Sequence, residues 1–109
     1  MWLPLIGLLI GIVLGLQLPI AVPVEFAKYM SVALLAAFDS VVGGIRANLE
    51  GKYDNTVFIT GFITNTFFAG GLAYIGEQIG VELYLAAVFV FGVRLFGNLA
   101  AVRRIIIKK

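Results

Sequence analysis

Residues Thr56–Gly76, TVFITGFITNTFFAGGLAYIG, contain no Asp, Glu, Lys or Arg. A helix of about 20 mostly apolar residues can cross the hydrocarbon core of a bilayer. Three further apolar stretches accompany this one, and together they predict helices over residues 2–18, 26–47, 56–76 and 83–102. Short polar or proline-bearing breaks separate them, and short connections make consecutive helices antiparallel neighbours. We therefore predict an all-α fold, a single transmembrane domain over residues 1–109 built as a four-helix bundle with a basic tail over 103–109.

The composition supports a membrane location and argues against several functions. Hydrophobic residues make up 61% of the chain, charged residues 13%, and the mean hydropathy is +1.06. A soluble domain has about 25% charged residues, and so short a chain cannot hide this much apolar surface inside itself. Cys and His are absent and the six carboxylates are scattered, so thiol and imidazole catalysis, disulfides and the common zinc and haem sites are excluded. We expect no enzyme, no catalytic residue, no cofactor and no metal site.

The basic residues predict the orientation. They gather at the C-terminus and around the break at residues 48–55: Arg46, Lys52, Arg103, Arg104, Lys108 and Lys109. With four spans, the break and the tail lie on one side, and the positive-inside rule makes that side cytoplasmic. We expect a multi-pass protein of the bacterial cytoplasmic membrane with both termini cytoplasmic. The opening Met1–Pro4 has no basic residue, so the first helix is expected to be retained rather than cleaved as a signal peptide. Too little polar surface remains for nucleic-acid binding.

Glycines follow one face of two predicted helices. Gly7, Gly11 and Gly15 are spaced by four in the first helix, and Gly61 begins a similar face of small residues in the third. Such a face lets a second helix backbone approach closely. Two uses stay open, namely packing within the chain and contact in a homo-oligomer.

Polar residues at membrane depth are the candidate functional residues. Asp39, Asn65 and Arg94 lie near the middles of the second, third and fourth helices. A charge at the bilayer centre costs about 2.5–3.5 kcal/mol on insertion scales, so opposite charges at equal depth predict an ion pair between Asp39 and Arg94. We expect Asn65 to add hydrogen bonds to this pair. The cluster would serve as structural glue, as a docking site for a partner's membrane helix, or as an ion or proton path.

Helical spacing extends this intramembrane polar cluster. Arg46 follows Asp39 by seven residues, and Asn98 follows Arg94 by four, so each shares a helix face with the earlier residue. The predicted cluster is Asp39, Arg46, Asn65, Arg94 and Asn98.

Four segments are distinctive: the opening MWLP of Met1–Pro4, DSVVGGIRANLEGKY over Asp39–Tyr53, GVELYLAA over Gly80–Ala87 and FGVRLF over Phe91–Phe96. Together they resemble the small basic protein family of Gram-positive and related bacteria. The resemblance implies a small polytopic membrane protein of unknown function, often encoded near cell-division genes. A second likeness, to small fluoride channels, is limited to a Gly-Gly…Arg element, an intramembrane Asn and many phenylalanines. Those channels form antiparallel dimers, and the basic C-terminus argues against that arrangement.

Two functions follow as hypotheses. The first is a non-enzymatic scaffold or adaptor in cell division or envelope assembly that associates with itself and docks other membrane proteins of these processes. The alternative is a small oligomeric channel or transporter that uses the intramembrane polar cluster. Both place the protein in contact with the lipid bilayer and predict a homo-oligomer.

Overall fold

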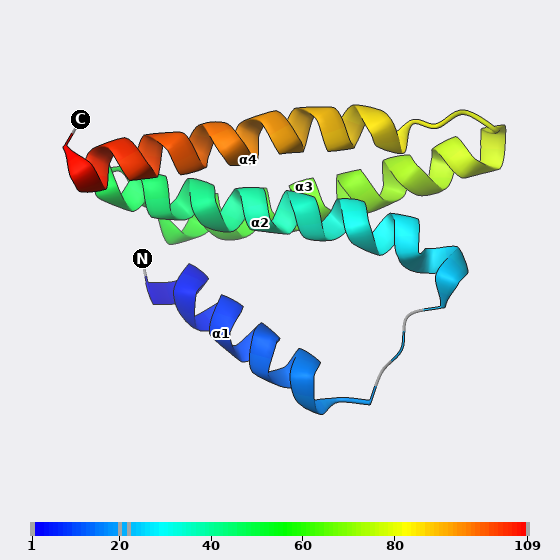
Figure 1. The fold of residues 1–109 in the computed structure, drawn as a ribbon, viewed down its shortest axis with the longest axis horizontal. Helices are drawn as coiled ribbons and strands as arrows, with labels where there is room; N and C mark the ends of the chain where they lie inside the picture. The colour runs from blue at the N-terminus through cyan, green and yellow to red at the C-terminus, as the bar shows by residue number, and fades with distance from the viewer. Residues whose placement is uncertain (1, 20, 22, 109) are drawn as a thin grey trace.

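The computed structural model describes residues 2–19, 21 and 23–108, and helices account for most of them. The elements are α1 (Trp2–Gln17), a short 3-10 turn η1 (Val24–Phe26), α2 (Ala27–Leu49), α3 (Asn55–Ile79) and α4 (Tyr84–Ile107). Successive helices run in opposite directions, so the start of α1, the α2–α3 turn and the end of α4 lie at the same end of the molecule (Figure 1). We call this the turn end. The all-α fold class is confirmed.

The helix bounds differ from the predicted ones, mainly at the C-terminal ends. α3 continues three residues beyond the predicted Gly76, to Ile79, and stops at Gly80, whose φ of 78° is a left-handed helix cap. α4 runs to Ile107, so Arg103 and Arg104 belong to the helix rather than to a tail. Basic residues suit a last helical turn because they oppose the negative end of the helix dipole. The last helix therefore continues five residues beyond its predicted end at residue 102, into the basic segment.

The α2–α3 turn has a defined helix cap. Asp54 accepts hydrogen bonds from the backbone N–H groups of Thr56 at 2.8 Å and Val57 at 3.1 Å. An aspartate at this position satisfies donors that the first turn of a helix cannot use internally. The cap fixes the point at which α3 begins, and hence the place of Lys52 and Tyr53 in the turn before it.

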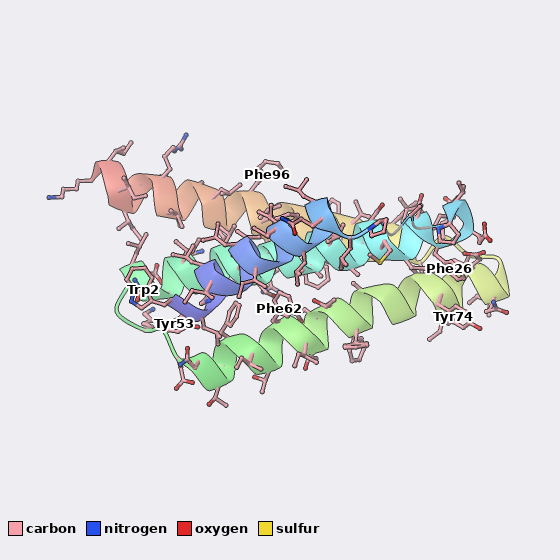
Figure 2. All side chains as sticks on the ribbon, turned by 90° about the horizontal axis from the view of Figure 1, so that it is seen from below. Trp2, Phe26, Tyr53, Phe62, Tyr74 and Phe96 are labelled. Atoms are coloured by element: carbon pink, nitrogen blue, oxygen red, sulfur yellow. The ribbon has the colours of Figure 1, made fainter. Side chains whose placement is uncertain are left out.

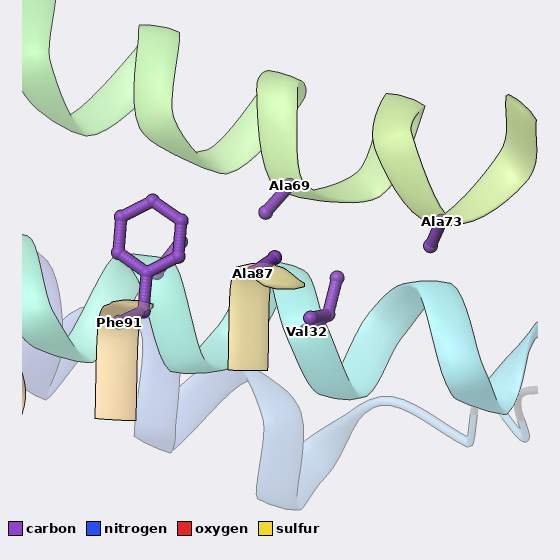
Figure 3. Close-up of a cluster of buried hydrophobic side chains, with 6 residues drawn as sticks. Val32, Ala69, Ala73, Ala87 and Phe91 are labelled. Carbon is purple, nitrogen blue, oxygen red and sulfur yellow. The ribbon is translucent and has the colours of Figure 1, made fainter. Parts of the chain in front are cut away.

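The packed core is small and is built mostly from alanines. α2 contacts both α3 and α4, which pack mainly against it rather than against each other. The buried apolar side chains between these helices are Val32, Ala36, Ala69, Ala73, Ala87 and Phe91 (Figure 3). Small side chains allow membrane helices to approach closely, where van der Waals contact drives association. Close packing of α2 with its two neighbours therefore holds the molecule together.

Gly76 closes the α3–α4 turn. A Cβ atom at this position would lie 2.5 Å from the Val81 carbonyl oxygen and 2.9 Å from the Leu83 backbone nitrogen. No larger residue fits there without moving the backbone. This is the tightest glycine contact among the described residues.

α1 is set apart from the other helices. It diverges from α2 toward its C-terminal end (Figure 1), and Pro4 is its buried residue among those described. Three helical stretches are long and apolar enough to cross a membrane: Val24–Leu49, Asn55–Ile79 and Tyr84–Ile107. α1 is apolar but has 16 residues, about 24 Å, against a hydrocarbon core of about 30 Å. The four-pass topology stays a prediction.

Large apolar side chains cover the outside. Phe67 and Phe68 are each 75% exposed and Phe89 is 73% exposed. Phe96 is 71% exposed and points away from the bundle (Figure 2). Contiguous exposed apolar surface of this kind would aggregate in water. Lipid is the solvent that suits it, as the composition predicts.

Candidate functional site

Asp39 is the centre of the polar cluster, and its side chain is completely buried within α2. Arg94 of α4 places its Nη2 atom 3.2 Å from Asp39 Oδ2, an ion-pair contact without the alignment of a hydrogen bond. Asn98, one turn later in α4, donates from Nδ2 to Asp39 Oδ1 at 3.0 Å. A buried carboxylate needs such partners because its desolvation is costly. The cluster therefore ties α2 to α4 within one chain.

The Arg94 guanidinium uses only part of its hydrogen-bonding capacity. Its side chain is 52% exposed, and its guanidinium carbon lies 5.6 Å from the centre of the Phe91 ring. A guanidinium carries five N–H donors, and the contact with Asp39 is made by Nη2. Most of its donor capacity is thus available to a further acceptor.

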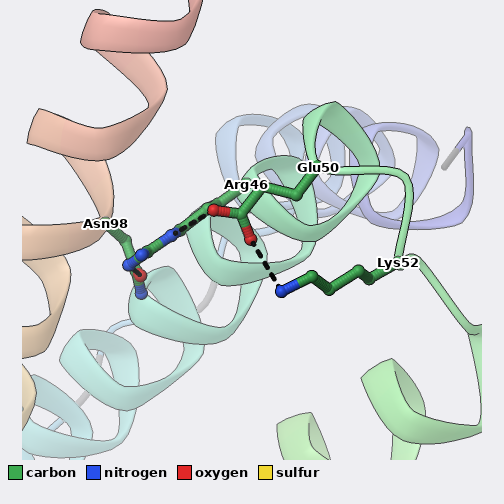
Figure 4. A network of polar contacts seen from close by, with 4 residues as sticks. All are labelled: Arg46, Glu50, Lys52 and Asn98. Carbon is green, nitrogen blue, oxygen red and sulfur yellow. Dashed lines mark hydrogen bonds and ion pairs between the residues drawn. The ribbon is translucent and has the colours of Figure 1, made fainter.

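The cluster continues from Asn98 to the turn end (Figure 4). Arg46 donates from Nη1 to Asn98 Oδ1 at 3.1 Å and from Nε to Glu50 Oε2 at 3.3 Å. Lys52 lies 3.9 Å from the other Glu50 oxygen. Asp39, Asn98 and Arg46 therefore form one chain of contacts that reaches the surface. Sequence reasoning missed Glu50, although its spacing of four after Arg46 is typical of a helical ion pair.

A polar cavity of about 300 Å³ lies beside this cluster. α3 and α4 diverge toward the turn end (Figure 2), and the cavity lies between them against α2. Its polar lining consists of Asp39, Ser40, Lys52, Tyr53, Asp54, Asn65, Arg94 and Asn98. The hydroxyl oxygens of Ser40 and Tyr53 are buried and have no hydrogen-bond partner among the described residues. Such groups call for a bound polar partner, because an unmade buried hydrogen bond costs about 1–3 kcal/mol.

Asn65 and Tyr53 both line the cavity, but the sequence predicted neither of these placements. Asn65 of α3 lies on the cavity wall, but no hydrogen bond joins it to Asp39 or Arg94 among the described residues. The divergence of α3 from α4 explains this difference, because it separates Asn65 from the pair. Tyr53 was not among the candidate site residues predicted from the sequence. Burial, and then the Asp54 carboxylate, raise the pKa of Tyr53, so its hydroxyl stays protonated at neutral pH.

Comparison with known proteins identifies the family. A family model described as protein of unknown function (DUF1290) matches residues 22–107. The chain belongs to this family. It is 50% identical to the "Small basic protein" of Bacillus subtilis, over 100% of this chain and 90% of that protein. It is also 45% identical to uncharacterized protein Mb1855 of Mycobacterium bovis, over 70% of this chain and 64% of that protein. No solved structure matches the chain.

The DUF1290 match includes the whole polar cluster and the cavity but not α1. The glycines of α1 therefore lie outside the matched segment, although the alignment with the Bacillus subtilis protein covers the full chain. The expected resemblance to the small basic protein family is confirmed.

The predicted packing glycines have open surroundings in this DUF1290 protein. At Gly7, Gly11, Gly15 and Gly61, a Cβ atom would meet no atom within 4 Å outside its own helix backbone and chain neighbours. Gly7 and Gly11 line an apolar groove of about 620 Å³ between α1, α2 and α3. The closest approach in α2 is instead at Gly44, where a Cβ atom would lie 3.1 Å from the Phe58 ring. Close packing within the chain therefore uses other glycines than those the four-residue spacing indicated.

A second polar group lies at the opposite end of the bundle. Tyr29 of α2 donates a hydrogen bond to Glu77 of α3, and the Lys28 ammonium lies 4.5 Å from the centre of the Tyr84 ring. These contacts join α2 to α3 and α4 near the α3–α4 turn. Neither was predicted, because the residues are far apart in sequence. The described residues hold no group of three His, Cys, Asp or Glu side chains that could bind a metal ion.

Proposed function

We propose that this DUF1290 protein is a non-enzymatic membrane adaptor that associates with a second copy of itself through α1. The observation that carries the proposal is the open glycine face of Gly7, Gly11 and Gly15. At each of them, the place that a Cβ atom would take has no neighbouring side chain or helix of the chain within 4 Å. Glycines spaced by four form a groove suited to a second helix backbone. Use of this face within one chain was the competing explanation, and the open surroundings favour contact between chains.

The polar cluster supports an adaptor because it connects elements of the protein to one another. Asp39 contacts two residues of α4, and Arg46 is held by Asn98 and Glu50. Charges that neutralise one another in this way fix the positions of helices. We propose this structural role for Asp39, Arg46, Arg94 and Asn98, with Asn65 lining the adjacent cavity. The family resemblance adds the proposal that the adaptor acts in cell division or envelope assembly.

Cysteine cross-linking tests the self-association, since the chain has no native cysteine. In native membranes, Gly11→Cys should give an oxidant-dependent dimer of twice the 11.7 kDa chain mass. Leu9→Cys is the matched control, because Leu9 is exposed but does not line the groove with Gly7 and Gly11. Equal cross-linking at both positions, or none at Gly11, would contradict a specific α1 contact.

Partner recovery tests the adaptor role. Tagged protein extracted gently from its native membrane should retain division or envelope membrane proteins identifiable by mass spectrometry. Gly11→Leu should reduce both self-association and partner recovery if α1 organises the assembly.

The alternative function is an oligomeric channel or transporter, and the polar cavity that reaches buried Asp39 favours it. A stable homo-oligomer without partners would support this alternative. Ion flux into liposomes that is abolished by Asp39→Asn would then identify a conducting path, whereas unchanged flux would rule out a role for Asp39 in it.

A further inference from the structure

The free hydrogen-bonding capacity of the polar cavity consists mainly of donors. The carboxylates in its lining already have partners: Asp39 contacts Arg94 and Asn98, and Asp54 accepts from two backbone N–H groups. The Asn98 oxygen accepts from Arg46. In contrast, the hydroxyls of Ser40 and Tyr53 have no partner among the described residues. The cavity therefore suits an occupant rich in acceptor oxygens.

Two cations add to this donor surplus. Lys52 is 76% exposed and makes one loose contact, 3.9 Å from Glu50. Arg94 is 52% exposed and contacts Asp39 through one terminal nitrogen. The carboxylates nearby are Asp39, Glu50 and Asp54, each of which has a partner. An anionic oxygen can thus enter beside Lys52 without displacing an existing hydrogen bond.

The donors lie at different positions along the length of the bundle. Lys52 and Tyr53 belong to the turn that precedes α3, whereas Ser40 lies near the middle of α2. The cavity is therefore cationic at its mouth, and deeper inside it has the Ser40 hydroxyl together with the paired charges of Asp39 and Arg94. A phospholipid has the same order, because its charged phosphate lies at the interface and its neutral ester carbonyls lie deeper.

We propose that the polar cavity binds the headgroup of an anionic phospholipid. The phosphate accepts from Lys52 and Tyr53 at the mouth, and the glycerol ester carbonyls extend toward Ser40. The acyl chains leave between α3 and α4, where the helices diverge. Phe58 and Phe62 line both the polar cavity and the apolar groove beside α1, and so form the wall between them. Lipid binding is consequently independent of the proposed self-association through α1.

Native mass spectrometry of the full chain from maltoside micelles tests this site, with dihexanoyl phosphatidylglycerol as the probe. The bound fraction at rising lipid concentration gives Kd. Loss of one hydrogen bond to a charged acceptor should weaken binding by about tenfold in Tyr53→Phe, and Lys52→Gln should have a similar effect. Neither substitution touches the pair of Asp39 and Arg94, so the fold is expected to persist, and the thermal midpoint without lipid checks this.

Tyr74→Phe is the matched control, because it removes the same hydroxyl from an exposed tyrosine near the other end of α3. Binding that is weakened in Tyr53→Phe but not in Tyr74→Phe supports the site. Equal Kd values in both variants would overturn it. Competition by inorganic phosphate at the same concentration would overturn the lipid as source, and equally tight binding of dihexanoyl phosphatidylcholine would overturn the preference for an anionic headgroup.

Discussion

Asp39 shows how one residue organises the bundle. Its carboxylate is fully buried, and both of its partners come from α4. The Asp39–Arg94 contact was predictable because opposite charges at equal membrane depth reduce each other's insertion cost. The hydrogen bond from Asn98 to Asp39 was not predictable. A spacing of four from Arg94 indicates that the two residues share a helix face, but it does not indicate which residue that face contacts.

Arg94→Leu tests the pair. The substitution leaves a buried carboxylate with one neutral partner, and we expect a loss of about 3 kcal/mol of unfolding free energy, the low end for a broken buried pair because Arg94 is half-exposed. Denaturant titration in micelles, followed by circular dichroism, measures it. The double variant Asp39→Asn/Arg94→Leu removes both charges and should be more stable than Arg94→Leu. If the double variant were less stable still, unpaired charge would not be the cause.

At the scale of the element, glycine spacing proved a poor guide to close contacts within the chain. Gly7, Gly11 and Gly15 satisfy the small-residue pattern but have open surroundings. At Gly76, near the end of α3, backbone atoms of the following turn lie within 3 Å of the position that a Cβ atom would take. The spacing of glycines describes the surface of a single helix. Whether a glycine is in close contact also depends on the path of the chain that follows the helix.

Gly76→Ala should open the α3–α4 turn. The added methyl would lie 2.5 Å from a backbone oxygen, and overpacking of this kind costs about 1–3 kcal/mol. Gly71→Ala in the same helix is the matched control, because nothing lies within 4 Å of its Cβ position. It should be neutral or more stable by up to about 1 kcal/mol, since alanine favours helix over glycine. Thermal unfolding in micelles compares the two, and equal midpoints would contradict the contact at Gly76.

The whole molecule has a clear charge asymmetry. Arg46 and Lys52 lie at or beside the α2–α3 turn, at the same end as Arg103, Arg104 and Lys108 of the last helix (Figure 1). At the opposite end, Glu77 of α3 and Glu82 of the α3–α4 turn are acidic, and Lys28 of α2 is basic. Since basic loops stay in the cytoplasm, we predict that the turn end is cytoplasmic.

Cysteine labelling tests this orientation without changing any charge. Asn48→Cys and Gln78→Cys place single thiols at opposite ends, and both native side chains are exposed. A membrane-impermeant maleimide applied to intact cells should label Gln78→Cys, and Asn48→Cys only after permeabilisation. The reverse pattern would show the opposite orientation, and labelling of both in intact cells would contradict a single orientation.

The apolar content alone determined that this chain is a helical protein suited to lipid, because 61% of its 109 residues are hydrophobic. In lipid the backbone N–H and C=O groups must hydrogen-bond to one another, and a helix achieves this within a single segment. The order of apolar stretches and polar breaks also determined the number of long helices and the positions of Asp39, Asn65 and Arg94 near the middles of three of them. The tertiary structure decided the rest. Asn98 meets Asp39 across 59 residues and Arg46 meets Asn98 across 52, and the cavity exists because α3 and α4 diverge. Such contacts depend on helix rotation and crossing angle, which the packing of small side chains at the interfaces sets and which periodicity along one helix does not encode.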